Sequence, residues 1–164
     1  MSGPVPVPRH QALRELYAYW DSKRGNGFAP PRRAIDPAEM RGLLPFIVLI
    51  DVVGLPPRFR IRLAGTKVVE AFGREITGLY VDEMDLDAVE HVVLTDLAEV
   101  VRDGRPNLAE REYTRNDGRH MKYERLVLPL STDGMTADKL LCGVVAEFAF
   151  GPARGGSVNP AVFP

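Results

Sequence analysis

The stretch FRIRLAGTKVVEAFGREITG, residues 59–78, reads as a strand, a Gly-Thr turn, a short helix and a second turn. A strand that runs through a glycine turn into a helix often holds phosphate, because backbone N–H groups and the helix dipole converge there. The glycines here are Gly65, Gly73 and Gly78, and their spacing fits neither the dinucleotide fingerprint nor the P-loop. The segment is therefore predicted to form a wall around an apolar space, with no backbone nest for an anion.

The strand at the start of this stretch alternates charged and apolar residues. Its arginines, Arg58, Arg60 and Arg62, share one face, and apolar side chains share the other. One face must then be solvated, which favours an antiparallel sheet over a doubly wound parallel one. We expect the arginines to lie opposite acidic residues of the sheet such as Glu110 and Glu112.

Apolar periodicity and turn residues predict an α+β fold for the rest of the chain. Apolar residues at spacings of three and four, among them Val93, Leu97 and Val100, predict a long helix from residue 85 to about 102. An Asn-Asp-Gly run at 116–118 between two strand-like runs predicts a β-hairpin. The predicted helices are 10–23, a short one from residue 36, and 85–102; the predicted strands are 46–53, 58–63, 108–114, 120–130 and 139–150.

Composition argues against several classes of function. The chain has 21 basic and 22 acidic residues and a net charge of −1, which gives no general attraction to nucleic acid or anionic membranes. Its start lacks the apolar core of a signal peptide, and no run reaches the roughly 18 apolar residues of a membrane span. Cys142 is the only cysteine, which excludes an intramolecular disulfide and a cysteine-based metal cluster. We expect a cytoplasmic protein that binds no nucleic acid, membrane or metal.

The order of elements and two stretches of sequence resemble the PAS domain superfamily. FRIRLAGTKVVEAFGREITGLYVDEM, residues 59–84, is similar to the second strand, the following helix and the glycine-rich turn of a PAS domain. YTRNDGRHMKYERLVLPL, residues 113–130, is similar to the central hairpin, with its Asp-Gly turn and Pro-Leu ending. The resemblance covers residues 35–148 and is strongest to short, stand-alone bacterial PAS proteins with an N-terminal helical extension.

The resemblance implies a five-stranded antiparallel sheet of order 2-1-5-4-3, with helices on one face and a ligand cavity between them. It divides the chain into a tail, amphipathic helix and linker at 1–34, a PAS-like domain at 35–150, and a flexible tail at 151–164. PAS domains serve as sensors and dimerisation modules. We therefore expect a non-catalytic, homodimeric sensor or interaction module that binds a small ligand and signals through a separate partner protein.

The expected cavity lies under the long helix and is mostly apolar. Glu90 is its polar member, because it falls about 40° from the centre of the helix stripe and so faces inward. A carboxylate there needs a partner, and an ion pair with Arg125, a frayed helix start and a contact to a polar ligand are all open. The candidate ligand-binding residues are Val69, Phe72, Ile76, Tyr80, Met84, Glu90, Val93, Leu97 and Tyr123.

The cofactor is unknown from sequence, and neither flavin nor haem is favoured. Flavin photochemistry in a PAS domain requires a cysteine just after the short helix, where this chain has Thr77 or Gly78. A haem ligand from the long helix would be His91, but helix phase turns this residue about 140° away from the stripe. Cys142 lies in the last strand and is expected to be a small buried hydrophobe.

The first helix carries an apolar stripe that something must cover. Leu13, Leu16, Tyr17 and Trp20 recur at helical spacing, and the glycines and prolines that follow indicate that the helix packs apart from the rest. These residues are the candidate dimer interface, since the N-terminal helices of PAS proteins commonly cover the sheet of a partner protomer. The other interpretation is that the helix covers its own sheet.

A small enzyme is the alternative class. A cone or hotdog fold, as in thioesterases and isomerases, also wraps a sheet around a helix and could use Asp51 or Glu90 as a base. A hotdog, however, has more strands after its long helix than this chain provides. The sequence contains no nucleophile elbow, zinc-binding H-E-x-x-H helix or cysteine–histidine pair, so we expect no catalytic residue.

Overall fold

A computed structural model describes residues 6–86, 89–115 and 117–149. They contain a five-stranded antiparallel sheet of order β2-β1-β5-β4-β3, which confirms the predicted fold class and excludes the hotdog arrangement. The predicted tail at 151–164 lies outside the described residues. The strands are β1 Ile47–Val53, β2 Arg58–Ala64, β3 Asn107–Thr114, β4 His120–Leu130 and β5 Lys139–Ala149.

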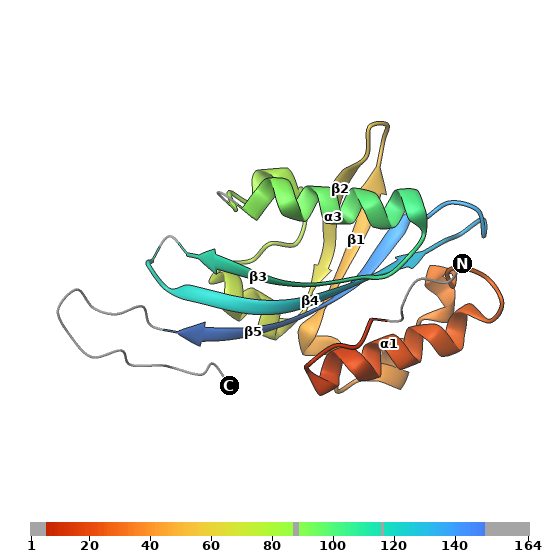
Figure 1. The fold of residues 1–164 in the computed structure, drawn as a ribbon, viewed down its shortest axis with the longest axis horizontal. Coiled ribbons are helices and arrows are strands. Elements are labelled where there is room, and N and C mark those ends of the chain that lie inside the picture. The colour runs from red at the N-terminus through yellow and green to blue at the C-terminus, as the bar shows by residue number, and fades with distance from the viewer. Residues whose placement is uncertain (1–5, 87–88, 116, 150–164) are drawn as a thin grey trace.

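Helices lie on both faces of the sheet. Helix α1, Gln11–Arg24, lies on one side and helix α3, Glu90–Asp103, on the other, as Figure 1 shows. We call the side toward α3 the inner face and the side toward α1 the outer face. The remaining helical segments are α2 Thr66–Phe72 and the 3₁₀ turns Arg32–Ala34, Pro37–Met40, Leu44–Phe46 and Val81–Glu83. None of the described helices is long and apolar enough to cross a membrane.

Helix α3 begins later than its pattern predicts. Its first residue is Glu90, and residues 87–88 of the predicted first turn lie outside the described part of the chain. Val93, Leu97 and Val100 are buried as predicted, and Asp96 is buried among them. The helix ends at Gly104, whose φ of 67° is the left-handed conformation that glycine adopts without strain.

A β-bulge changes the face of one β2 residue. Leu63 lies opposite Leu49, whereas Ile61 lies opposite the next residue of β1, Ile50, so Arg62 is the extra residue of the bulge. Leu63 therefore moves to the outer face, where 47% of its surface is exposed. The predicted alternation of solvent-facing arginines and core-facing apolar residues therefore holds in β2 only as far as Ile61.

The arginines of β2 have partners near their own strand. Arg58 forms an ion pair with Asp82 at 2.8 Å, and Arg62 forms one with Asp51 at 2.7 Å. The predicted pairing with Glu110 and Glu112 is wrong, because β2 and β3 are the two opposite edges of the sheet.

Helix α1 packs on the outer face of its own sheet. Leu13, Leu16 and Trp20 are 1–2% exposed and belong to the same apolar cluster as β4 and β5 residues, while Tyr17 is half-buried. The prediction that this helix packs apart is therefore wrong, and the own-sheet interpretation holds. The stripe is part of this chain's core, so it is not a free surface for a second protomer.

Hydrogen bonds fix both ends of α1. The buried Glu124 carboxylate accepts from the backbone N–H groups of Arg9, at 2.7 Å, and His10, at 2.9 Å, where the helix begins. Near the other end the indole Nε1 of Trp20 donates to the carbonyl oxygen of Pro129 at 2.8 Å. Both partners belong to β4, so this strand fixes the position of the helix along the sheet.

Candidate functional site

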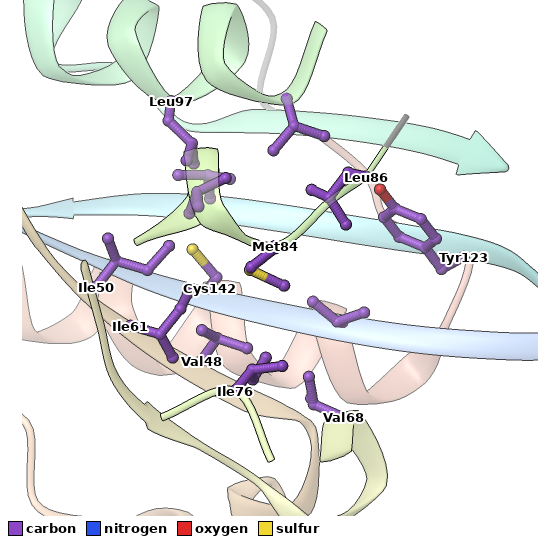
Figure 2. Close-up of a cluster of buried hydrophobic side chains, with 14 of the residues drawn as sticks. Val48, Ile50, Ile61, Val68, Ile76, Met84, Leu86, Leu97, Tyr123 and Cys142 are labelled. Atoms are coloured by element: carbon purple, nitrogen blue, oxygen red, sulfur yellow. The ribbon is translucent and has the colours of Figure 1, made fainter. Parts of the chain in front are cut away.

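A small cavity lies between the inner face and α3. Its volume is about 60 Å³, room for a few water-sized groups and below the roughly 300–1,000 Å³ of typical small-molecule pockets. Figure 2 shows side chains from the sheet, from α3 and from the segment between α2 and α3 pointing toward one another around this space. Of the predicted ligand-binding residues, Phe72, Ile76, Met84, Val93, Leu97 and Tyr123 line it.

Three predicted lining residues lie elsewhere. Val69 is half-buried, and its neighbour Val68 is the residue of α2 that enters the core. Tyr80 lies beside the edge strand, with the guanidinium of Arg58 3.8 Å from its ring centroid. Glu90 is half-buried and does not line the cavity, and its carboxylate forms no hydrogen bond or ion pair within the described part of the chain.

The buried carboxylate under α3 is that of Asp96. Its Oδ2 accepts from Nη2 of Arg111 at 2.6 Å and from Nη2 of Arg125 at 2.7 Å. Arg125 also donates to Oδ1 of Asn107 at 3.1 Å. The predicted pair between Glu90 and Arg125 is therefore wrong. Asp96 is three residues after Val93 and four before Val100, so the spacing of the helix stripe could have found it.

The arginines of this cluster keep N–H groups without acceptors. Nε and Nη1 of Arg125 and Nε of Arg111 are buried and have no hydrogen-bond partner among the described residues. Arg125 is 5% exposed and lines the cavity. Two guanidinium groups face one carboxylate, so the cluster carries a net positive charge beside an apolar space. Buried donors nearly always have a partner, which in this cavity must come from water or a ligand.

The other polar groups at the cavity are uncharged. Burial raises the pKa of the Tyr123 hydroxyl and raises the pKa of the Cys142 thiol to about 12, so both keep their protons at neutral pH. Cys142 is buried, as predicted, and behaves as a small apolar residue. His91 is exposed on α3, as predicted. Within the described ranges no group of three histidine, cysteine or acidic residues is placed to hold a metal ion.

Asp51, the candidate base of the enzyme alternative, lies on the outer face. Burial opposes its ionisation, but hydrogen bonds from Lys139 Nζ at 2.8 Å and Arg62 Nε at 2.7 Å outweigh that effect and lower its pKa. A carboxylate held ionised by two cations is a weak base. Its two ion pairs connect β1 to β2, through Arg62, and to β5, through Lys139.

The chain belongs to the PAS domain family, whose sequence profile matches residues 8–146. The match includes α1, in agreement with the packing of this helix on the sheet. PAS domains are typically non-catalytic sensory modules. No curated protein matches the sequence.

Solved structures with the same fold are distant in sequence. A Rhodobacter sphaeroides LOV protein is 14% identical over 68% of each chain, with a TM-score of 0.52. A light-oxygen-voltage domain from a study with a flavin analogue is 16% identical over 69% of this chain and 87% of its own, with a TM-score of 0.52. A fungal LOV domain photoreceptor is 15% identical over 81% of this chain and 90% of its own, with a TM-score of 0.51. At these identities the likeness supports the fold alone.

Proposed function

We propose that the protein is a sensory PAS module that binds a small anionic or hydrogen-bond-accepting ligand at Arg125 and signals through a separate partner protein. The observation that carries this proposal is that Arg125, which lines the inner cavity, has buried Nε and Nη1 groups without acceptors among the described residues. A buried donor left unpaired costs about 1–3 kcal/mol, more when its group is charged, so an acceptor that enters the cavity gains that energy.

The cluster favours an anion over a neutral ligand. Asp96 balances only one of the two guanidinium charges, and Arg125, which lines the apolar cavity, is 5% exposed. A cavity of about 60 Å³ suits an acceptor of a few heavy atoms, such as formate. A larger ligand would require α3 to move away from the sheet.

Strand β4 offers a route from this site to the outer face. Arg125 points to the inner cavity, and its neighbour Glu124 holds the start of α1 on the other side. Successive residues of a strand point to opposite faces, so a shift of the backbone at Arg125 also moves Glu124. We propose that α1 is the element through which ligand binding reaches a partner.

The test is a titration with sodium formate at constant ionic strength, followed by NMR of the arginine Nε–H groups. The expected result is a saturable shift of the Arg125 signal. Arg125→Met should keep the fold, because Asp96 then keeps Arg111 as its single cationic partner at 2.6 Å, and should lose the formate effect on backbone signals around the cavity. Arg33→Gln, an exposed residue, is the matched control. Equal responses of the wild type and Arg125→Met would overturn the proposal.

The homodimer and the cytoplasmic location remain predictions. Sedimentation velocity over a range of concentrations measures the first directly. Because the α1 stripe is buried within one chain, a dimer would have to use another surface. Native mass spectrometry of the protein as isolated would report the oligomer and any bound anion together.

A further inference from the structure

A second hollow lies on the outer face, beside α1. Its volume is about 430 Å³, within the range of small-molecule pockets. Helix α1 covers β4 and β5 and leaves the β1–β2 side of this face to the 3₁₀ turns at 32–46. The hollow lies between those turns and the strands. Its main apolar lining residues are Ile35, Met40, Leu44, Ile47, Leu49 and Leu63.

Two features of the backbone form this hollow. The bulge at Arg62 brings Leu63 onto the outer face, where it lines the wall and remains 47% exposed. Gly65 lets the chain approach closely, because a Cβ there would collide with the carbonyl oxygens of Leu44 and Pro45. Both features belong to the edge of the sheet, on the face opposite the inner cavity.

Charge on the lining residues has one sign. Arg32 and Arg41 line the hollow, and none of the other lining residues is charged. Arg32 donates Nη1 to the carbonyl oxygen of Ile35 at 2.9 Å, and the exposed Arg41 has no ion pair within the described part of the chain. An occupant with an apolar body and an anionic head would match both parts of this surface.

We propose that this outer groove binds a small amphipathic anion, with an aliphatic body against Leu49 and Leu63 and a carboxylate or phosphate head at Arg41 and Arg32. The site is independent of the inner cavity, because the two lie on opposite faces of the sheet and share no lining residue.

Decanoate below its micelle concentration is the probe, with decanol as its uncharged match, and binding is followed by NMR chemical shifts. Decanoate should bind about 5-fold more tightly than decanol, as expected for one exposed charge contact. Arg41→Gln should reduce that difference, because Arg32 alone then contacts the head, and should leave decanol binding unchanged. Leu63→Glu should weaken both by about 10-fold or more, because it places a charge in the apolar wall.

Two controls separate the possible outcomes. Met135→Glu, on a loop residue that is 82% exposed and outside the groove, should change neither affinity. Arg125→Met should bind decanoate as the wild type does, so failure of the inner site leaves this result intact. The proposal would be overturned if decanoate showed no saturable binding to the wild type. It would also be overturned if Arg41→Gln and Leu63→Glu bound decanoate with the same affinity as each other. Self-association that Leu63→Glu abolishes would also overturn it, since the groove would then hold a second copy of the chain.

Discussion

Helices α1 and α3 pack on the sheet in opposite ways. On the outer face, α1 brings leucine side chains against Gly143, and the buried groups of Glu124 and Trp20 find hydrogen-bond partners. On the inner face, α3 leaves a cavity of about 60 Å³ and arginine N–H groups without acceptors. The outer contact is satisfied within one chain, whereas the inner contact lacks acceptors that a ligand or water can supply.

The largest expected effect comes from the outer face. Trp20→Ala removes a side chain that is 2% exposed, together with its hydrogen bond to Pro129, and should cost about 3–5 kcal/mol of unfolding free energy. Urea unfolding followed by circular dichroism measures the loss. Tyr17→Ala, on the half-buried neighbour in the same helix, should cost clearly less. Equal and small losses for both variants would show that α1 contributes little to the core.

The sheet could be predicted from sequence because its signals are local. The Asn-Asp-Gly run predicts a hairpin turn between β3 and β4. The spacing of Val93 and Leu97 predicts which side of α3 is buried. The register of β2 could not be predicted, because the alternation of charged and apolar residues does not indicate a bulge at Arg62. Leu63 therefore looked like a core residue and proved to be exposed.

The candidate site was harder to predict than the fold. Six of the nine predicted residues line the cavity, since helix and strand periodicity indicates which face is buried. The error at Glu90 has a physical cause: α3 begins at that residue, so residues 85 and 86, from which the helical wheel was started, do not belong to the helix. The docking of α1 depends on Gly143, a single small residue in a distant strand, which no helix pattern can reveal.

The next effect compares adjacent residues on opposite faces of β5. A Cβ on Gly143 would lie 2.5 Å from Leu13 Cδ2 and 2.8 Å from Leu16 Cδ2, so Gly143→Ala should cost about 1–3 kcal/mol through overpacking. Val144 lines the inner cavity, and Val144→Ile should be neutral or stabilise by up to about 1 kcal/mol. Gly42→Ala, where an added Cβ meets nothing within 4 Å, is the control. Equal losses of unfolding free energy in Gly143→Ala and Val144→Ile would contradict the difference in packing between the two faces.

A smaller effect is expected where α1 begins. Glu124→Gln replaces a carboxylate that accepts two backbone N–H groups by an amide with one acceptor oxygen, and should cost about 1 kcal/mol. Hydrogen exchange should speed up at the amides of Arg9 and His10 and remain unchanged at the end of the helix. Glu112→Gln, an exposed residue on β3 whose ionic partner is His120, is the control and should leave these amides protected. Unchanged exchange in Glu124→Gln would contradict the proposed route through β4.

The smallest effect compares two carboxylates that each contact two cations. Asp96 is paired beneath α3, whereas Asp51 is paired with Lys139 and Arg62 on the outer face. The pKa of Asp51 is lowered from its ordinary 3.8, because the hydrogen bonds outweigh the effect of burial. Its contribution to stability is therefore complete above pH 3.8 and is lost as the pH falls through the lower, folded-state pKa.

Asp51→Asn should therefore lower the melting temperature at pH 6, by an amount that corresponds to about 1 kcal/mol or less, and the difference from the wild type should shrink as the pH approaches 2. Thermal unfolding at constant ionic strength measures both. Part of the difference should disappear at 1 M salt, because the arginine of this pair is more than half exposed, with 56% of its side chain accessible. A penalty that stays constant across this pH range would mean that the charge of Asp51 does not stabilise the fold, and that its hydrogen bonds are equally well made by the amide.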